Sequence, residues 1–455
     1  MPSPNERAEP STSSLSRTLG LRDLVLIVVG TVIGSGIFLV PSMVLRQTGG
    51  DARVALLVWM VAGVLSLLGA LTYAEMGAAK PDAGGLYVYI RDAFGPLPAF
   101  LYGWTAFFVI ASGSVATLAV AFTAYLRQLV PVSPVAAKVI AVVIIALIAA
   151  VNVRGVRQAA NVQNVSTAIK AGAIVVMSVL LLALGEGASA AASPDVASPA
   201  GISLVSGVGL AMIAVLWAYE GWQYATFSAG ETVDPQRTFP RAIVLGTVLL
   251  IAIYLLANVA YVAALGTTGV MASERVAADA VSAVLGPAAG KVIAAVILVS
   301  MFSAANGVTL TAPRLYFSMA RDRVFFAKLA EVHPRFGTPA LAIVASSVWA
   351  MLLAVTGTFE QLLTYVVFIG WIFYALGGLA IFAYRRRQPG MPRPFRTPGY
   401  PLTPVLFVAS AAAIVLNTIV SQPGRAALGI GLVLLGVPAF YIWRGREAAV
   451  RRPRD

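Results

Sequence analysis

Long apolar stretches recur along the whole chain, separated by short segments that carry most of its charged residues. A helix needs about 20 mostly apolar residues to cross the hydrocarbon core of a bilayer. The pattern predicts twelve membrane-spanning helices, at 23–45, 54–78, 97–126, 135–152, 159–185, 203–229, 241–265, 288–319, 339–356, 360–383, 402–420 and 426–443. The expected fold class is therefore an all-α polytopic membrane protein.

The composition agrees with this interpretation. The chain has 455 residues, of which 59% are hydrophobic and 11% are charged, whereas about a quarter of the residues of a soluble domain are charged. No long polar insert divides the apolar stretches. We therefore expect one membrane unit, with the lipid bilayer as its surroundings, and not several soluble domains.

Basic residues predict the orientation of the chain. The formal net charge is +13. If both termini are cytosolic, 23 Lys and Arg residues fall in the inside segments and seven in the outside segments, as the positive-inside rule requires. The expected location is the cell (inner or plasma) membrane, with both termini in the cytosol. The basic charge is thus a topology signal, and we expect no nucleic-acid partner.

Residue types that are absent exclude several functions. The chain has no cysteine, so it can form no disulfide link to an ancillary subunit and no thiolate metal site. His333 is the single histidine and lies in a polar run, where we interpret it as a loop residue. We expect no metal and no cofactor. An intramembrane enzyme is a remote alternative, because no base and nucleophile are arranged for it. A channel lacks support because no ring of like charges or repeated filter motif occurs.

The first predicted span is interrupted by residues that weaken a helix. Gly34, Ser35 and Gly36 occupy its middle, between Gly30 and Pro41. A break in a membrane helix frees amides and carbonyls, which persist only where they line a cavity or are buried in protein. Free amides at a helix N-terminus bind anions, and free carbonyls suit an ammonium group. Close helix packing through the Gly30-x-x-x-Gly34 spacing is the alternative, and the spacing leaves both open.

The sixth predicted span carries a charge at its centre. Glu220 is the only charged residue between Val196 and Gly230, and Gly221 follows it. A charged side chain at this depth faces a cavity or a partner; a glutamate that only holds helices together is the alternative. Interrupted helices at corresponding positions of two halves are a sequence signal of a transporter binding site.

Lys170 is a second buried charge, in the fifth predicted span. It is the only charged residue between Arg157 and Glu186, and it lies too deep for an interfacial lysine. Its ammonium group must meet carbonyls, hydroxyls or a carboxylate inside the bundle. A structural ion pair with Glu220 or another acid is the alternative to a functional role.

Three stretches resemble the amino acid–polyamine–organocation (APC) superfamily of permeases, and in particular its L-type amino acid transporter branch. They are VGTVIGSGIFLVPS in the first span, QNVSTAIKAG in the fifth, and YEGWQYATFSAGETVDPQRTFPRAI in the sixth span and the loop after it. The resemblance implies a five-plus-five inverted repeat, discontinuous helices 1 and 6, and alternating access. The implied segments are an arm at 1–22, a first repeat at 23–186, an external loop at 187–202, a second repeat at 203–384, a basic loop at 385–401, two peripheral spans at 402–443 and a tail at 444–455.

The resemblance also implies roles for individual residues. The amides of Gly34, Ser35 and Gly36 would bind the substrate carboxylate. The carbonyls of Ile33, Trp217 and Ala218 would bind its amine. Trp217 and Tyr224 match gating aromatic residues, and Lys170 matches a lysine that replaces a sodium ion. Glu220 stands where several relatives for neutral substrates have glycine and relatives for cationic substrates have an acid.

The resulting functional hypothesis is a sodium-independent L-amino acid transporter that exchanges its substrates, which are small and neutral or also cationic. Proton symport on the same fold is the alternative, with Glu220 or Lys170 as the titrating group. The sequence does not separate these two mechanisms.

Overall fold

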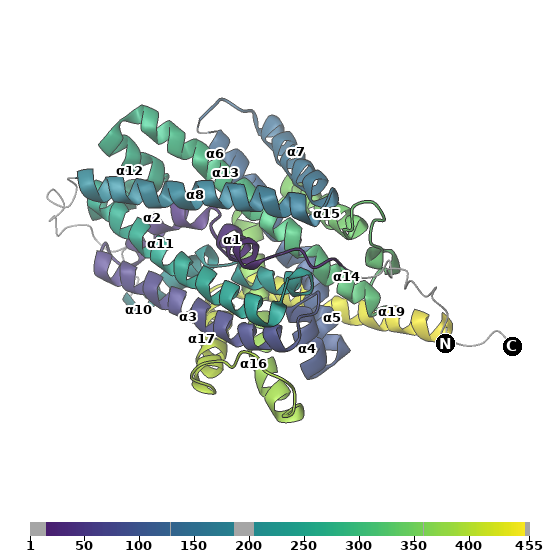
Figure 1. Cartoon of the computed structure of the whole chain (residues 1–455). Coiled ribbons are helices and arrows are strands. Elements are labelled where there is room, and N and C mark those ends of the chain that lie inside the picture. Colours follow the sequence, from purple (N-terminus) through teal and green to yellow (C-terminus); the bar gives the residue numbers. More distant parts are fainter. Residues whose placement is uncertain (1–14, 128, 186–203, 358, 451–455) are drawn as a thin grey trace, which may run out of the picture.

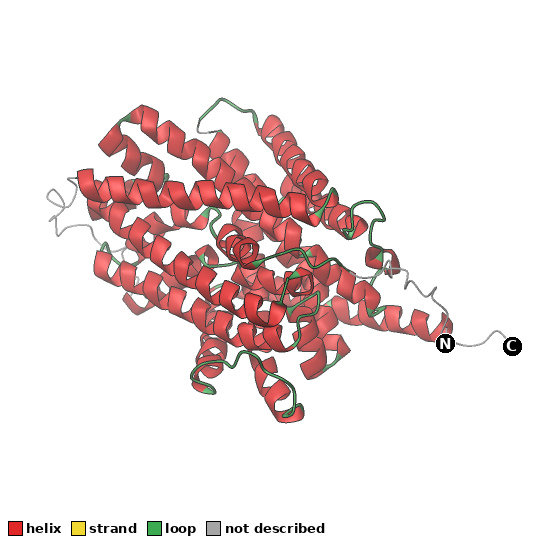
Figure 2. Cartoon of the chain, in the orientation of Figure 1, coloured by secondary structure: helices red, strands yellow, loops and turns green. Residues whose placement is uncertain are grey.

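The computed structural model describes residues 15–127, 129–185, 204–357 and 359–450. Within these ranges the chain is almost entirely helical (Figure 2), and its one β-bridge joins Leu19 to Thr232. The predicted external loop at 187–202 lies outside the described residues, as do 1–14 of the predicted arm and 451–455 of the predicted tail.

The helices follow the chain in the order expected from the apolar stretches. They are α1 (Leu21–Val32), α2 (Gly36–Gln47), α3 (Ala52–Ala79), α4 (Leu86–Phe94), α5 (Pro96–Thr105), the π-helix η1 (Ala106–Ile110), α6 (Ala111–Leu126), α7 (Pro134–Val153), α8 (Val156–Leu184), α10 (Leu204–Ala218), the 3₁₀-helix η2 (Trp222–Glu231), α11 (Pro235–Ala272), α12 (Val276–Leu285), α13 (Pro287–Thr311), α14 (Pro313–Arg321), the 3₁₀-helix η3 (Ala327–Ala330), α15 (Ala340–Thr356), α16 (Phe359–Arg387), α17 (Leu402–Ser421), α18 (Pro423–Leu434) and α19 (Gly436–Val450).

Local sequence explains where many of these helices begin. Six of them, α5, α7, α11, α13, α14 and α18, start with a proline, whose fixed φ suits the first helical position and whose missing N–H would have had no partner there. Asp51 caps α3 by accepting the amides of Arg53 and Val54 at 2.8 and 3.2 Å. Ser133 accepts the amide of Ala136 at 3.2 Å at the start of α7. These caps satisfy amides that the helix itself leaves free.

In the described part, nine single helices or continuous runs of helices are long and apolar enough to cross a membrane, and the bent pair α1 and α2 makes ten. The two remaining predicted spans correspond to shorter helices. These are α10, with 15 residues, and α15, with 17. The structure therefore supports a multispan membrane protein, and the count of twelve stays a prediction.

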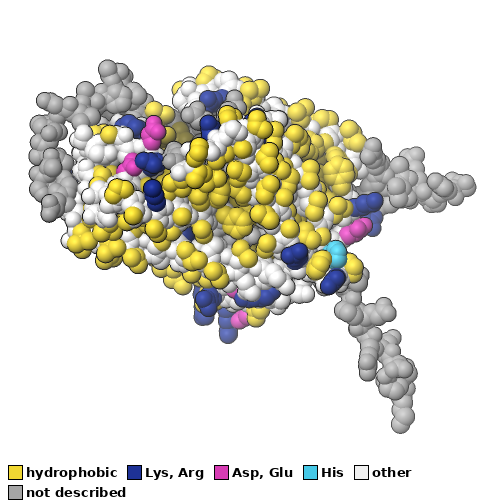
Figure 3. All heavy atoms as spheres, turned by 90° about the horizontal axis from the view of Figure 1, so that it is seen from above, with side chains coloured by type: hydrophobic (Ala, Val, Ile, Leu, Met, Phe, Trp, Pro, Cys, Tyr) yellow, Lys and Arg dark blue, Asp and Glu magenta, His cyan; other side chains and the backbone are white. Residues whose placement is uncertain are grey.

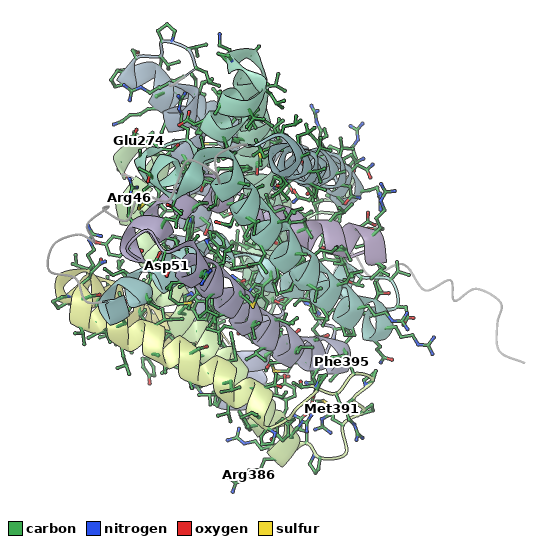
Figure 4. The ribbon with its side chains drawn as sticks, turned by 90° about the vertical axis from the view of Figure 1, so that its left-hand side faces the viewer. Arg46, Asp51, Glu274, Arg386, Met391 and Phe395 are labelled. Carbon is green, nitrogen blue, oxygen red and sulfur yellow. The ribbon has the colours of Figure 1, made fainter. Side chains whose placement is uncertain are left out.

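The surface of the bundle suits a membrane. Large apolar side chains such as Leu147, Val176 and Val348 are more than half exposed. Figure 3 shows hydrophobic side chains over the middle of one face and charged side chains toward its margins. In Figure 4, Asp51 lies where α3 begins, and Arg386 lies well apart from it, at the lower edge of the molecule. This separation is what a protein with an aqueous region on each side of a bilayer needs.

Helices from both halves of the chain surround the two broken helices. α1 lies at the centre and contacts α8, α11 and α13, while α10 contacts α2 and α3. Figure 1 shows α1 end-on, between α8 and α11. The fold thus brings residues near position 34 against residues near position 220.

Candidate functional site

The first span is interrupted where the sequence predicts it. α1 ends at Val32 and α2 begins at Gly36, with a bend of 45° between them. Ile33 has an extended backbone, and Ser35 occupies the N-cap position of α2 without a hydrogen bond from its side chain to the helix. The first amides of α2 therefore have no capping side chain.

The sixth predicted span is interrupted in the same region of the bundle. α10 ends at Ala218, and the 3₁₀-helix η2 begins at Trp222. Gly221 lies between them with a φ of +130°, a region that favours glycine. A Cβ added there would lie 3.0 Å from the carbonyl oxygen of Thr31. Glycine thus permits both the turn and the close approach of α1.

Gly36 lies where α2 packs against α10. A Cβ added to this residue would lie 2.6 Å from both the Cα and the Cβ of Ala218. The sequence predicts for Gly36 only an amide that binds the substrate carboxylate. The structure adds a packing role, because α2 and α10 touch at this point.

A pocket lies between the two breaks. It encloses about 30 Å³, which is room for about two water molecules. Its lining consists of Thr31, Val32, Gly34, Ser35, Gly36, Ser114, Leu118, Trp217, Glu220, Gly221, Tyr224 and Val308. An amino acid is larger than this space, so binding requires the half-helices or the aromatic side chains of Trp217 and Tyr224 to move apart.

Most of the predicted site residues line this pocket. They are Gly34, Ser35, Gly36, Trp217, Glu220 and Tyr224. Ile33, Ala218 and Lys170 do not line it. They lie directly behind it, where their polar groups bond to the neighbouring helices. The site thus consists of a lining layer and a supporting layer.

Ser35 carries the clearest unused polar group of the pocket. Its side chain is 2% exposed, and among the described residues its Oγ has no hydrogen-bond partner. A buried hydroxyl without a partner costs free energy. The hydroxyl lies at the start of α2, where the helix dipole favours a negative group. This end of the pocket is therefore ready to bind an anion.

The carbonyl oxygens predicted to bind an amine already accept hydrogen bonds within the protein, and they differ in how many they accept. The Ile33 oxygen accepts hydrogen bonds from Lys170 Nζ and from Ser300 Oγ. The Trp217 oxygen accepts the amide of Glu220 at 3.0 Å, and the Ala218 oxygen accepts the hydroxyl of Tyr254 at 3.0 Å. Because a carbonyl oxygen has two lone pairs, Trp217 and Ala218 keep one for another donor, whereas Ile33 has both in use.

Lys170 is fully buried. Its Nζ donates to the carbonyls of Gly30 at 2.6 Å and Ser300 at 3.3 Å, in addition to that of Ile33. No carboxylate among the described residues forms a salt bridge with it. The alternative of an ion pair with Glu220 is therefore wrong for this structure. The ammonium group instead holds the carbonyl end of α1 against α13.

Glu220 has uncharged partners. Its Oε1 accepts Gln223 Nε2 at 2.6 Å and the hydroxyl of Tyr374 at 2.5 Å. Gln223 Nε2 also lies 2.8 Å from the Tyr374 hydroxyl. Glu220 lines the pocket, and both donors to its carboxylate bind the same oxygen, Oε1. The carboxylate is placed to accept a further donor from a bound molecule.

Sequence reasoning missed four residues that support the site: Gln223, Tyr254, Ser300 and Tyr374. Each is a polar side chain inside a predicted apolar span, which is the signal that would have drawn attention to it. Tyr254 lies within hydrogen-bond distance of the carbonyls of both Val32 and Ala218. It therefore connects the ends of both half-helices, α1 and α10.

Comparisons with known proteins agree with this architecture. The model of the amino acid permease family matches residues 19–438. The chain belongs to the amino acid permease family. It is 31% identical to the serine/threonine exchanger SteT of Bacillus subtilis over 440 residues, which cover 96% of this chain and 99% of that protein.

Two further relatives come from human. The b(0,+)-type amino acid transporter 1 is 34% identical, with 95% of this chain and 89% of that protein covered. The large neutral amino acids transporter small subunit 2 is 32% identical, with 94% and 81% covered. These matches confirm the resemblance to APC permeases of the L-type branch. The chain is therefore a membrane amino acid transporter, and the enzyme alternative is set aside.

Proposed function

We propose that this permease is a sodium-independent exchanger of L-amino acids. The observation that carries the proposal is the pocket between the two helix breaks, with the N-terminus of α2 at one side and Glu220 at the other. A zwitterion offers a carboxylate for the amides and an amine for the carbonyls. Because the closed pocket is smaller than an amino acid, the substrate binds when one side of the bundle opens.

In this proposal the substrate carboxylate binds the amides of Gly34, Ser35 and Gly36. Support comes from the unpartnered Ser35 hydroxyl and from the dipole of α2. The amine binds the free lone pairs of the Trp217 and Ala218 carbonyls. The Ile33 carbonyl takes part only if the amine displaces Lys170 or Ser300 from it.

The proposed architecture has twelve spans, with α10 and η2 together as the sixth and α15 as the ninth. The first ten form an inverted repeat, at 23–186 and 203–384, and both termini face the cytosol. Alternating access then consists of the half-helices moving against the surrounding helices. The α1 bend and the break after α10 supply the hinges that such a movement needs.

Lys170 takes the place of a coupling sodium ion in this proposal. Its ammonium group already supplies a positive charge to three carbonyl oxygens, the type of ligand that a sodium ion would use. The ammonium group thus occupies carbonyl oxygens that a sodium ion would need as ligands. Transport therefore proceeds without sodium.

Glu220 is the proposed contact for the substrate side chain. Glu220 lines the pocket, and its carboxylate suits a cationic or hydroxyl-bearing side chain, since both donate hydrogen bonds. One relative is named a serine/threonine exchanger, and serine and threonine both bear a hydroxyl. The small pocket favours small neutral substrates as well.

Proton symport is the second candidate. The observation in its favour is that Glu220 and Lys170 both lie inside the bundle without an oppositely charged partner among the described residues. Either group could change its protonation state during the transport cycle. The same experiment tests both candidates.

That experiment is counterflow in proteoliposomes. Vesicles are loaded with one unlabelled amino acid, labelled amino acids are offered outside, and sodium and pH are varied. Exchange predicts uptake that needs internal substrate and is unchanged when sodium is removed. Accumulation driven by a pH gradient without internal substrate would select proton symport, and strict sodium dependence would refute the role given to Lys170.

A further inference from the structure

The last turn of α16 and the loop that joins it to α17, together residues 385–401, are strongly basic. They contain Arg385, Arg386, Arg387, Arg393 and Arg396. No acidic residue occurs between Glu360 and Glu447. The segments that precede and follow the five arginines in the chain therefore supply no negative charge to neutralise them. The structure shows which of the five arginines already have anionic partners.

Two of the arginines are used inside the protein. Arg385 forms a bidentate pair with Glu75, at 2.9 and 2.7 Å, and lies 3.6 Å from the ring centre of Tyr400. Arg393 lies 3.5 Å from Glu75 and donates to four backbone carbonyls of the loop and the end of α16. These contacts fix the loop to α3 and α16 and neutralise Glu75.

The other three arginines, Arg386, Arg387 and Arg396, are exposed. Arg387 gives one N–H to the carbonyl of Ala93. Among the described residues Arg386 and Arg396 form no salt bridge. Figure 4 shows Arg386 at the edge of the molecule, pointing away from the bundle. We call these three residues the basic patch.

Acidic side chains of neighbouring helices do not neutralise the basic patch. Asp92, on α4, accepts a hydrogen bond from Lys80 at 2.6 Å and from Arg91 at 3.0 Å. Asp322, at the end of α14, is paired with Arg91 at 2.6 Å. Asp92 and Asp322 are therefore occupied by other basic residues, and the patch keeps its positive charge.

An apolar surface follows the basic patch directly. α17 begins at Leu402, one residue after the loop, and its first turns expose Leu402, Val405 and Leu406 by 61%, 47% and 45%. In a membrane these side chains contact lipid chains. The patch therefore lies at the boundary between the hydrocarbon core and water, at the depth of the lipid headgroups.

We propose that the guanidinium groups of the basic patch bind headgroups of anionic phospholipids. A guanidinium group matches phosphate oxygens in charge and in fork-shaped geometry, and the exposed start of α17 contacts the acyl chains. Binding holds the ends of α16 and α17 against the membrane surface. This inference is independent of the transported substrate and of the coupling ion.

The test uses the full-length protein purified in detergent. Native mass spectrometry measures binding of phosphatidylglycerol and of phosphatidylcholine to the wild type and to the triple variant Arg386→Gln, Arg387→Gln, Arg396→Gln. Each basic residue near an anionic surface contributes roughly a fivefold change in affinity. The triple variant is therefore expected to bind phosphatidylglycerol about 100-fold more weakly, with phosphatidylcholine binding unchanged.

A matched control removes three exposed basic residues of predicted outside segments, in the variant Arg53→Gln, Lys138→Gln, Lys291→Gln. It is expected to keep wild-type affinity for phosphatidylglycerol. An equal loss in the control would overturn the assignment to the basic patch, because it would show a general effect of net charge. Unchanged phosphatidylglycerol binding by the triple patch variant would overturn it as well.

Two further measurements test whether the ligand is a lipid and whether charge holds it. Inorganic phosphate at millimolar concentration should not compete with phosphatidylglycerol; competition would show that the patch binds free phosphate and would overturn the lipid assignment. If the triple variant unfolds, the wild type alone still gives a test. Its phosphatidylglycerol affinity should fall steeply with added salt, and affinity independent of salt would refute an electrostatic headgroup site.

Discussion

The contact between Gly36 and Ala218 leads to the sharpest prediction, for the variant Gly36→Ala. The new Cβ would lie 2.6 Å from the Cα and Cβ of Ala218, whereas unstrained carbon atoms are separated by 3.5–4.0 Å. Both opposing atoms belong to the α10 backbone or sit directly on it. They cannot rotate away, so α2 and α10 must separate by roughly 1 Å.

The size of this displacement determines how much stability and how much transport activity the variant should lose. Inserting a carbon atom into a packed contact costs about 1–3 kcal/mol of stability. A shift of about 1 Å in groups that position a substrate lowers activity roughly 100-fold. Gly36→Ala should therefore lower the counterflow rate by one to two orders of magnitude and lower the thermal unfolding midpoint. Gly36→Val, which adds a larger side chain at the same place, should abolish uptake.

The assay is counterflow in proteoliposomes, with thermal unfolding measured on the same preparations in detergent. Gly172→Ala is the matched control, because Gly172 lies in the membrane helix α8 and a Cβ there would meet no atom within 4 Å. The control should transport at the wild-type rate. Wild-type transport and stability in Gly36→Ala would refute the argument, since the half-helices would then not be in contact at this point.

Three other predictions address charge. Glu220→Gln should lower counterflow of arginine and lysine by about 10- to 100-fold, the loss expected for a hydrogen bond to a charged group, and preserve that of alanine; equal losses would point to a coupling or structural role. Replacing sodium with choline should leave wild-type counterflow unchanged, and an uptake that stops would contradict the role of Lys170. Burial would raise the pKa of Asp92, but hydrogen bonds from Lys80 and Arg91 hold it below the ordinary value of 3.8. The ionised Asp92 carboxylate therefore contributes its full stabilisation of the fold above pH 3.8. This contribution is lost as the pH falls through the lower pKa that Asp92 has in the folded protein. Asp92→Asn should lower the unfolding midpoint at pH 7 but not in strong acid, and a difference that persisted in acid would disprove the pairing.

The sequence alone determined the features that depend on the bilayer. Every backbone polar group in lipid must be satisfied within its own helix, so long apolar stretches locate the helices without knowledge of their neighbours. The same requirement makes the Gly34–Gly36 interruption and the buried charges Glu220 and Lys170 conspicuous. The positions of the two breaks were therefore predictable from local sequence.

The tertiary structure decided which of these features meet. Lys170 bonds to backbone carbonyls and not to Glu220, whose oxygen is held by Gln223 and Tyr374. Gly36 packs against Ala218, and the Ile33 carbonyl is already occupied. Such contacts join residues that are far apart in the chain, and they depend on how whole helices pack side by side. No periodicity within one span encodes that lateral arrangement, so only the folded bundle shows which polar groups are satisfied and which, like Ser35, remain available.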